Sequence, residues 1–162
     1  MAENRISIKF TVIISAVILL ITAFYFAAAT VFPRRYNEEI AAASAAYGID
    51  ENLICAVIWT ESKFDESAVS GKGASGLMQM MPETRAEQSR LSGIAADGGA
   101  LSEIMLGTGY LARMIKLTGD EQIALMAYNA GIGSISRWDE PYAETKEYVR
   151  RVNLARNIYK YL

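Results

Sequence analysis

Glu61 is the carboxylic acid whose position in this sequence is best suited to chemistry. It follows the apolar run 53–59 and lies at i+7 from Ile54, on the same helical stripe as Val57 and Ile58. Burial and the negative end of a helix both disfavour the charged form, so we expect the pKa of Glu61 to be raised. A carboxyl that holds its proton near neutral pH can act as a general acid. The alternative is that Glu61 sits at the mouth of the helix and points to solvent.

The residue types that are missing narrow the chemistry further. The sequence has no histidine, which excludes histidine-based triads, imidazole acid–base catalysis and zinc sites built on imidazole. Cys55 is the one cysteine, so an internal disulfide and a thiolate metal cluster are excluded, and its apolar neighbours indicate a buried core residue. Catalysis would therefore depend on carboxylates, hydroxyls, amides or lysine, and we predict no metal, nucleotide or other cofactor.

Three clusters of polar and aromatic residues are not explained by helix packing. The first is Glu-Ser-Lys-Phe at 61–64, and the second is Gly-Ala-Ser-Gly-Leu-Met-Gln-Met-Met-Pro-Glu-Thr at 73–84. The third is Ala-Tyr-Asn-Ala-Gly-Ile-Gly at 127–133, followed by Glu-Thr at 144–145 and Tyr-Val at 148–149. In this order and spacing they resemble the catalytic domain of the soluble lytic transglycosylases, the SLT family, which is lysozyme-like, related to goose-type lysozyme, and cleaves peptidoglycan. The resemblance covers nearly all of residues 36–160.

The resemblance implies a role for each residue that matches the family's motifs. Glu61 matches the catalytic acid/base, and Glu144 matches a second recurring carboxylate with a supporting role. One departure lies outside the catalytic motif, because the family often has Asn-Ile where this chain has Glu103 and Ile104. The residues that the resemblance implies to bind the glycan are Ser70, Met78, Gln79, Met80, Tyr128, Asn129 and Tyr148.

The implied reaction needs only one carboxyl group. An ordinary glycosidase uses two, about 5–5.5 Å apart for retention or about 6.5–9.5 Å apart for inversion, and Glu61 is the one convincing buried carboxyl here. In the transglycosylase scheme, protonated Glu61 donates to the β-1,4 glycosidic oxygen between N-acetylmuramic acid and N-acetylglucosamine, and the muramic acetamide stabilises the developing cation. Glu61 then takes the proton of the C6 hydroxyl, which closes a 1,6-anhydro ring. Tyr128 and Asn129 would hold the acetamide and the Glu61 carboxyl, and Gln79 would hydrogen-bond the sugar.

The same residues also fit ordinary structural roles. Asn129, two residues before Gly131, suits a helix C-cap. The methionines in 78–81 suit core filling, Met81 above all. The remaining alternatives are core tyrosines with satisfied hydroxyls at Tyr128 and Tyr148, a loop residue at Ser70, and a helix N-terminal carboxylate at Glu144.

Two other functions compete with the lytic transglycosylase. A muramidase of the lysozyme type would hydrolyse the same bond, with Asp65 or Glu66 activating water. A non-catalytic peptidoglycan-binding module of a larger envelope complex would have no use for an acid such as Glu61. Residues 33–162 carry 14 Lys and Arg against 17 Asp and Glu, a net charge of −3 without a basic stripe, so nucleic acid is not an expected partner.

Helical periodicity without strand-like alternation predicts an all-α fold. Asp50, Ser102 and Asp120 are suitable N-caps for three of its helices. Gly107 and Gly109, inside one predicted helix, indicate close helix–helix approach. The predicted lysozyme-like domain has about seven helices, drawn from the segments 36–47, 50–62, a turn or short helix at 76–82 closed by Pro82, 83–91, 102–119, 120–130, a short turn around Trp138, and 144–161.

The first 32 residues predict a membrane anchor. The chain is 52% hydrophobic, and no charged residue lies between Lys9 and Arg34. A helix of about 20 apolar residues, at a rise of about 1.5 Å each, crosses a hydrocarbon core of roughly 30 Å. We therefore predict a short tail at 1–9, a transmembrane helix at 10–32 and a catalytic domain at 33–162.

The orientation of this anchor does not follow from charge alone. Arg5 and Lys9 before the span are balanced by Arg34 and Arg35 after it. We place the tail inside and the domain on the periplasmic or cell-wall side, because the expected partner, the peptidoglycan strand, lies there. A signal peptide cleaved near the alanines at 27–29 is the alternative.

Overall fold

The computed structural model describes residues 2–135 and 143–162, with side chains from residue 9 onward. Regular structure in these ranges is helical, apart from two isolated β-bridges, Val69–Ser75 and Ser75–Met80. The predicted all-α class is therefore confirmed for the described part of the chain. The helices are α1 (Ala2–Val31), α2 (Asn37–Tyr47), α3 (Glu51–Ser62), α4 (Pro82–Ser92), α5 (Ala100–Thr118), α6 (Glu121–Ala130), α7 (Ile132–Ile135) and α8 (Ala143–Tyr159).

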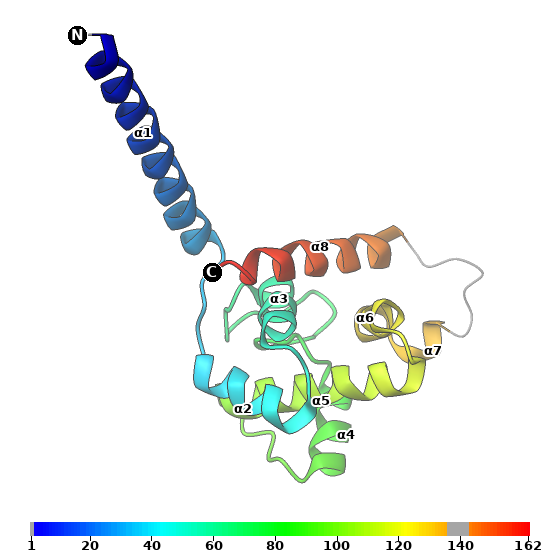
Figure 1. Cartoon of the computed structure of the whole chain (residues 1–162). Helices are drawn as coiled ribbons and strands as arrows, with labels where there is room; N and C mark the ends of the chain where they lie inside the picture. Colours follow the sequence, from blue (N-terminus) through cyan, green and yellow to red (C-terminus); the bar gives the residue numbers. More distant parts are fainter. Residues whose placement is uncertain (1, 136–142) are drawn as a thin grey trace.

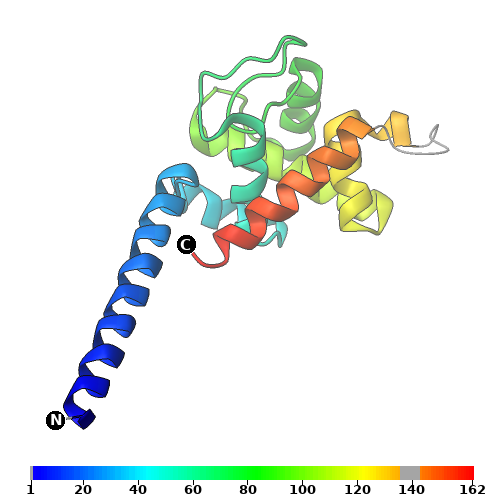
Figure 2. The same ribbon diagram turned by 90° about the horizontal axis from the view of Figure 1, so that it is seen from above.

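Helix α1 projects away from the other helices, as Figure 1 and Figure 2 show from two directions. Within it, the 23 residues Lys9–Val31 are long and apolar enough to cross a membrane. Their large apolar side chains, such as Phe24 at 76% exposure, have no protein surface covering them. An apolar helix of this length can be covered by the acyl chains of a bilayer. The span overlaps closely with the predicted anchor at 10–32.

The end of α1 is held against the domain by aromatic residues. The indole Nε1 of Trp59, in α3, donates a 2.9 Å hydrogen bond to the carbonyl of Val31. Phe32 stacks on the Trp59 ring with 4.3 Å between centroids. The Tyr159 hydroxyl, at the end of α8, donates to the Pro33 carbonyl at 3.2 Å. Helix α1 therefore joins the domain next to the helix that carries Glu61.

Helix α3 is the centre of the domain. Asp50 caps it as predicted, accepting a hydrogen bond from the Asn52 N–H at 3.0 Å. The six residues 53–58 are all buried, as expected for a helix segment that is apolar on every side. Figure 1 shows α3 with α8 on one side and α2 and α5 on the other, and α3 packs closely along α8. The site is built around the end of this buried helix.

Two glycines in α5 allow close packing. A Cβ on Gly109 would lie 2.9 Å from the ring of Tyr47 in α2, so the predicted helix–helix approach is confirmed there. A Cβ on Gly107 would lie 2.4 Å from Sδ of Met78, which is in a loop. Gly107 therefore allows close approach of the loop before α4, and not of a second helix as predicted.

The boundaries of two helices differ from the prediction. Helix α5 begins at Ala100 with Gly99 as its N-cap, so the prediction of Ser102 as the cap is wrong. Ser102 lies inside the first turn, where its hydroxyl hydrogen-bonds Asp97 and the Gly99 carbonyl. Pro82 begins α4 and does not close the preceding turn. Proline suits this position because N–H groups in the first turn of a helix have no partner within the helix, so its missing N–H costs no hydrogen bond. The predicted turn around Trp138 lies outside the described residues.

Candidate active site

A cleft of about 920 Å³ opens beside the C-terminal end of α3. It is bounded by the loop after α3, the start of α4, the middle of α5, the end of α6 and the start of α8. The residues that line it are Glu61, Ser70, Gly71, Lys72, Ala74, Gln79, Met81, Thr84, Tyr110, Tyr128, Asn129, Ala130, Gly131, Ser134, Glu144 and Thr145.

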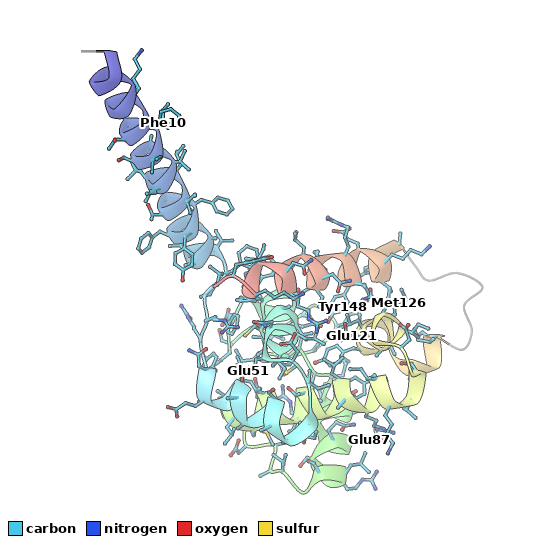
Figure 3. The ribbon with its side chains drawn as sticks, viewed as in Figure 1. Phe10, Glu51, Glu87, Glu121, Met126 and Tyr148 are labelled. Carbon is cyan, nitrogen blue, oxygen red and sulfur yellow. The ribbon has the colours of Figure 1, made fainter. Side chains whose placement is uncertain are left out.

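Glu61 lines this cleft with its carboxyl group held by a tyrosine. The Tyr148 hydroxyl donates a hydrogen bond of 2.8 Å to Oε1 of Glu61. Tyr148 is 2% exposed, and Figure 3 shows it on the inner side of α8, toward α3 and α6. Burial raises the pKa of Tyr148 well above its ordinary value, so the phenol keeps its proton and remains a donor.

The surroundings of Glu61 favour its protonated form. Burial raises the pKa of this carboxyl from 4.5 to about 7, outweighing the Tyr148 hydrogen bond and the charge of Arg151, which both lower it. The predicted upward shift therefore has its expected cause, desolvation. At neutral pH the protonated and ionised forms are both well populated, so the group can donate a proton and then accept one.

The backbone turns sharply directly after Glu61. Lys63, the C-cap of α3, has φ 53° and Phe64 has φ 65°, both in the left-handed region that side-chain-bearing residues rarely adopt. Phe64 is 1% exposed and packs between the rings of Tyr36 and Tyr159, which fixes this turn in place. Such a backbone persists only where its surroundings hold it, and it directs the next segment along the cleft.

Residues 75–81, which we call the cleft wall, are held by hydrogen bonds from several elements. The Tyr128 hydroxyl donates to the Met78 carbonyl at 2.8 Å, and the Ser62 hydroxyl donates to the Leu77 carbonyl at 2.8 Å. Gln79 has φ 46°, and its Nε2 donates at 2.9 Å to the carbonyls of Ala68 and Gly76. The Gln79 amide nitrogen is therefore used inside the loop, whereas its oxygen makes no hydrogen bond within the described residues and can meet a ligand.

The tight turn of the cleft wall decides which methionines face the cleft. Met78 and Met80 are 1% and 4% exposed and do not line it, so the expectation that they contact glycan is not supported by their positions. Met81, which we expected in the core, is 38% exposed and lines the cleft. Helical periodicity does not apply to this segment, because Gln79 adopts a left-handed conformation and changes the direction of the following side chains.

Tyr128 and Asn129 reach the cleft in a different way from that expected. The Tyr128 ring lines the cleft, but its hydroxyl is occupied by the Met78 carbonyl and holds the wall instead of a ligand. Asn129 is exposed in the last turn of α6, where Gly131 and not Asn129 is the C-cap. Within the described residues the Asn129 side chain makes no hydrogen bond, which leaves its amide available to a ligand.

Ser70 and Glu144 both line the cleft at its edges. The Ser70 hydroxyl accepts a hydrogen bond from the Ala74 N–H at 3.0 Å, which closes the loop that carries it. Glu144 lies exposed in the first turn of α8, one helix turn before Tyr148. The structure thus brings five predicted residues (Ser70, Gln79, Tyr128, Asn129 and Glu144) into one cleft with Glu61, and places Tyr148 behind Glu61.

Tyr110 is a cleft residue that the sequence did not suggest. It lines the cleft from α5, with its ring centroid 5.3 Å from that of Tyr128. In the sequence it lies on the apolar stripe of the helix predicted at 102–119, where a packing residue is expected. No feature of the sequence distinguishes Tyr110 from the core residues of α5. Only the position of the cleft in the folded domain shows that it lines the cleft.

The two carboxylates proposed to activate water lie elsewhere. Neither Asp65 nor Glu66 lines the cleft. Asp65 accepts hydrogen bonds from the N–H and hydroxyl of Ser67 at 2.9 and 2.7 Å, and Glu66 accepts one from the Tyr36 hydroxyl. Across residues 2–135 and 143–162, no group of three or more His, Cys, Asp or Glu side chains is placed to hold a metal ion.

Comparison with known proteins identifies relatives of the helical domain. A family model described as "Transglycosylase SLT domain" matches residues 38–150. A protein of Enterobacteria phage PRD1 named "Transglycosylase" is 36% identical over 115 residues, which are 71% of this chain and 40% of that protein. The "Membrane-bound lytic murein transglycosylase C" of Mannheimia succiniciproducens is 33% identical over 128 residues, covering 68% of this chain and 36% of that protein.

Solved structures agree with the sequence relatives. An inactive mutant of lytic transglycosylase Slt from Pseudomonas aeruginosa superposes with a TM-score of 0.73 and 32% identity. The match covers 79% of this chain and 24% of the other. This chain therefore spans less than half the length of the relatives that it matches, and corresponds to one part of each.

Proposed function

This chain belongs to the transglycosylase SLT domain family, and we propose that it is a membrane-anchored lytic transglycosylase that cleaves peptidoglycan glycan strands. The observation that supports this most is Glu61: a carboxyl with a pKa of about 7, on the wall of a cleft of about 920 Å³, held by a buried phenol. A glycan-binding surface alone would not require a carboxyl whose charge is disfavoured by burial.

The proposed reaction begins with proton transfer from Glu61 to the glycosidic oxygen between N-acetylmuramic acid and N-acetylglucosamine. The bond from the muramic C1 to that oxygen breaks, and the muramic acetamide oxygen stabilises the positive charge at C1. Glu61, now a carboxylate, accepts the C6 hydroxyl proton while the C6 oxygen bonds to C1. The products are a 1,6-anhydromuramic end and a free N-acetylglucosamine hydroxyl, Glu61 is reprotonated, and no water is consumed.

Tyr148 and the cleft residues have separate roles in this scheme. The Tyr148 hydrogen bond stabilises the carboxylate form of Glu61 between the two proton transfers. Asn129 and the Gln79 oxygen would hydrogen-bond the sugars, and the rings of Tyr110 and Tyr128 would contact their apolar faces. Ser70 would contribute at the edge of the cleft, and Glu144 would support the site without transferring a proton in the main reaction.

Hydrolysis by a muramidase is the second candidate, because one further carboxylate does lie in the described part of the cleft. That residue is Glu144, and not Asp65 or Glu66. A hydrolase would use it to activate water and would release a reducing muramic end. The transglycosylase product lacks one molecule of water relative to that end, so mass spectrometry of digested peptidoglycan separates the two reactions.

The experiment that tests the function is digestion of purified peptidoglycan by the full chain and by its Glu61→Gln variant. We expect anhydromuramic products from the parent and none from the variant, with folding and glycan binding retained in the variant. If the parent released reducing muramic ends in place of anhydro ends, the enzyme would be a hydrolase and not a lyase. Cleavage by the variant at the parent's rate would contradict the role of Glu61, and binding without any cleavage by the parent would favour a binding module.

We further propose that the helix at 10–32 stays in the mature protein and anchors a domain at 33–162 on the outer side of the cytoplasmic membrane. The exposed apolar surface of Lys9–Val31 and the membrane-bound relatives support the anchor. The outer side follows from the substrate. The mass of the protein extracted from membranes separates a retained helix from a signal peptide cleaved near 27–29.

A further inference from the structure

We propose that Arg85 and Glu103 form a buried positioning pair that holds the cleft wall where it can bind glycan. The inference rests on the proposed function, since it assigns the wall to glycan binding. Neither residue lines the cleft, and neither belongs to the motifs that carry the reaction. They act through the backbone of the segment between them.

Glu103 is an acidic residue buried in α5 at 8% exposure. Its Oε2 accepts a hydrogen bond of 2.8 Å from the Leu77 N–H, at the centre of the cleft wall. Its Oε1 lies 3.1 Å from a guanidinium nitrogen of Arg85. Both carboxylate oxygens are thus directed at the wall or at the helix that follows it.

The neighbouring glycine leaves room for this carboxylate. Gly76 has φ 81°, and a Cβ there would lie 2.2 Å from Oε2 of Glu103. A side chain at position 76 would therefore collide with the carboxylate and also strain the backbone. The wall is therefore shaped around the Glu103 carboxylate.

Arg85 extends the support to the beginning of the wall. Its NH2 group donates to the Ser75 carbonyl at 2.7 Å and to the Ser75 hydroxyl at 3.3 Å. Arg85 lies in the first turns of α4, one residue after Thr84 and four after Met81, which both line the cleft. The pair therefore connects α5 and α4 with the beginning and the centre of the wall through two side chains.

The two residues depend on each other because both are largely removed from water. The side chains of Arg85 and Glu103 are 21% and 9% exposed. Removal of one partner leaves the other as a poorly compensated buried charge, whereas removal of both charges together can be close to neutral. A double variant should therefore bind glycan better than either single variant.

The test is a double-mutant cycle on the full chain, carried in the Glu61→Gln background so that ligand is not consumed. The variants are Arg85→Met, Glu103→Gln and both together, and the probe is an N-acetylglucosamine tetramer titrated by calorimetry. We expect each single variant to weaken binding by roughly tenfold, since a displaced wall loses its oriented contacts. We expect the double variant to recover to within about threefold of its parent.

A matched control exists on the same two helices. Arg113 of α5 and Glu87 of α4 form an ion pair at 2.8 Å, but their side chains are 40% and 42% exposed and neither contacts the wall. Figure 3 labels Glu87 on α4. The variants Arg113→Met and Glu87→Gln should leave the dissociation constant within about twofold, because exposed pairs contribute little.

Binding and stability together decide the outcome. Thermal unfolding of every variant is recorded, and binding is measured at a temperature where each is folded. Single variants that lower the unfolding temperature but leave the dissociation constant unchanged would overturn the proposal and make the pair merely structural. Single effects that add in the double variant would also overturn it. Binding does not require turnover, so an unsubstituted chain with Glu61 intact that binds the tetramer but cleaves no peptidoglycan would refute the proposed activity and leave this inference standing.

Discussion

The Tyr148 hydroxyl donates a hydrogen bond of 2.8 Å to Oε1 of Glu61, joining two residues that are 87 positions apart in the sequence. Tyr148 belongs to α8 and Glu61 to the end of α3, the two helices packed along each other at the centre of the domain. The contact sets the balance between the two forms of the carboxyl, because burial favours the acid and the phenol favours the carboxylate.

The rate of glycan cleavage should fall as the pH rises through about 7, the pKa of Glu61. The free enzyme must carry the proton that it donates, so only the protonated fraction is competent, and that fraction decreases tenfold per pH unit well above the pKa. The measurement is the pH profile of kcat/KM for release of anhydro ends from peptidoglycan. A profile that stays level from pH 6 to 9 would contradict Glu61 as the acid.

Replacement of Tyr148 by phenylalanine should move this alkaline limb to higher pH. The hydrogen bond lowers the pKa of Glu61, so its loss leaves desolvation less opposed and raises that pKa further. We also expect kcat to fall by about 10- to 100-fold, because the carboxylate formed in the first step loses its donor. Tyr159→Phe is the control, since this buried tyrosine donates to the Pro33 carbonyl and does not contact Glu61. Equal pH profiles for the two variants would refute the prediction.

Glu61→Gln should stabilise the fold at alkaline pH. The pKa of Glu61 is raised from 4.5 in the unfolded chain to about 7 in the folded one, so the folded state binds more protons between these values. The stability associated with this group is present below pH 4.5 and is lost as the pH rises through about 7. At pH 8 the variant should therefore exceed the parent by up to about 3 kcal/mol in the free energy of unfolding.

The comparison at low pH completes this test. At pH 4 the carboxyl is protonated in both states of the parent, so the difference between parent and variant should shrink to about 1 kcal/mol or less. Urea unfolding at the two pH values measures it. A difference that does not depend on pH would mean that Glu61 titrates near its ordinary value and is not desolvated.

Some of these relationships follow from the sequence, and their physical origin explains why. Asp50 and Asp120 cap their helices as predicted, because capping depends only on neighbouring backbone N–H groups. The burial of α3 and the raised pKa of Glu61 follow from a continuous apolar run that ends in a carboxylate. These are local patterns, and the fixed period of a helix determines on which side of it each residue lies.

The cleft wall could not be predicted in the same way. In residues 75–81 the direction of each side chain depends on the left-handed φ of Gln79 and on hydrogen bonds with Ser62, Glu103 and Tyr128, which belong to three other helices. The positions of Met78, Met80 and Met81 therefore depended on contacts that a periodic pattern does not contain. The same holds for the Tyr128 hydroxyl, whose partner is 50 residues away.

Asn129→Ala should weaken glycan binding without changing stability. Within the described residues the Asn129 amide makes no hydrogen bond, so its removal breaks nothing in the free protein. A lost hydrogen bond to the sugar costs about 1 kcal/mol, or roughly fivefold in affinity. Titration with the N-acetylglucosamine tetramer and a thermal melt measure the two quantities. Asn157→Ala, an exposed position toward the far end of α8, is the control. A drop in the unfolding temperature with unchanged affinity would indicate a structural role.

Glu144→Gln separates the two proposed reactions most directly. Glu144 is exposed at the start of α8 and lines the cleft, so it is the residue that would activate water if the enzyme were a hydrolase. Under the transglycosylase proposal Glu144 transfers no proton in the main step. The variant should therefore keep anhydro products and lose no more than about tenfold in rate, the scale of a displaced supporting contact. Glu147→Gln is the control, because Glu147 lies on the same helix and pairs with Arg150 at the surface. The contrary result has two parts: the parent releases reducing ends, and Glu144→Gln, but not Glu147→Gln, loses all cleavage. That result would make Glu144 the water-activating base and the enzyme a muramidase.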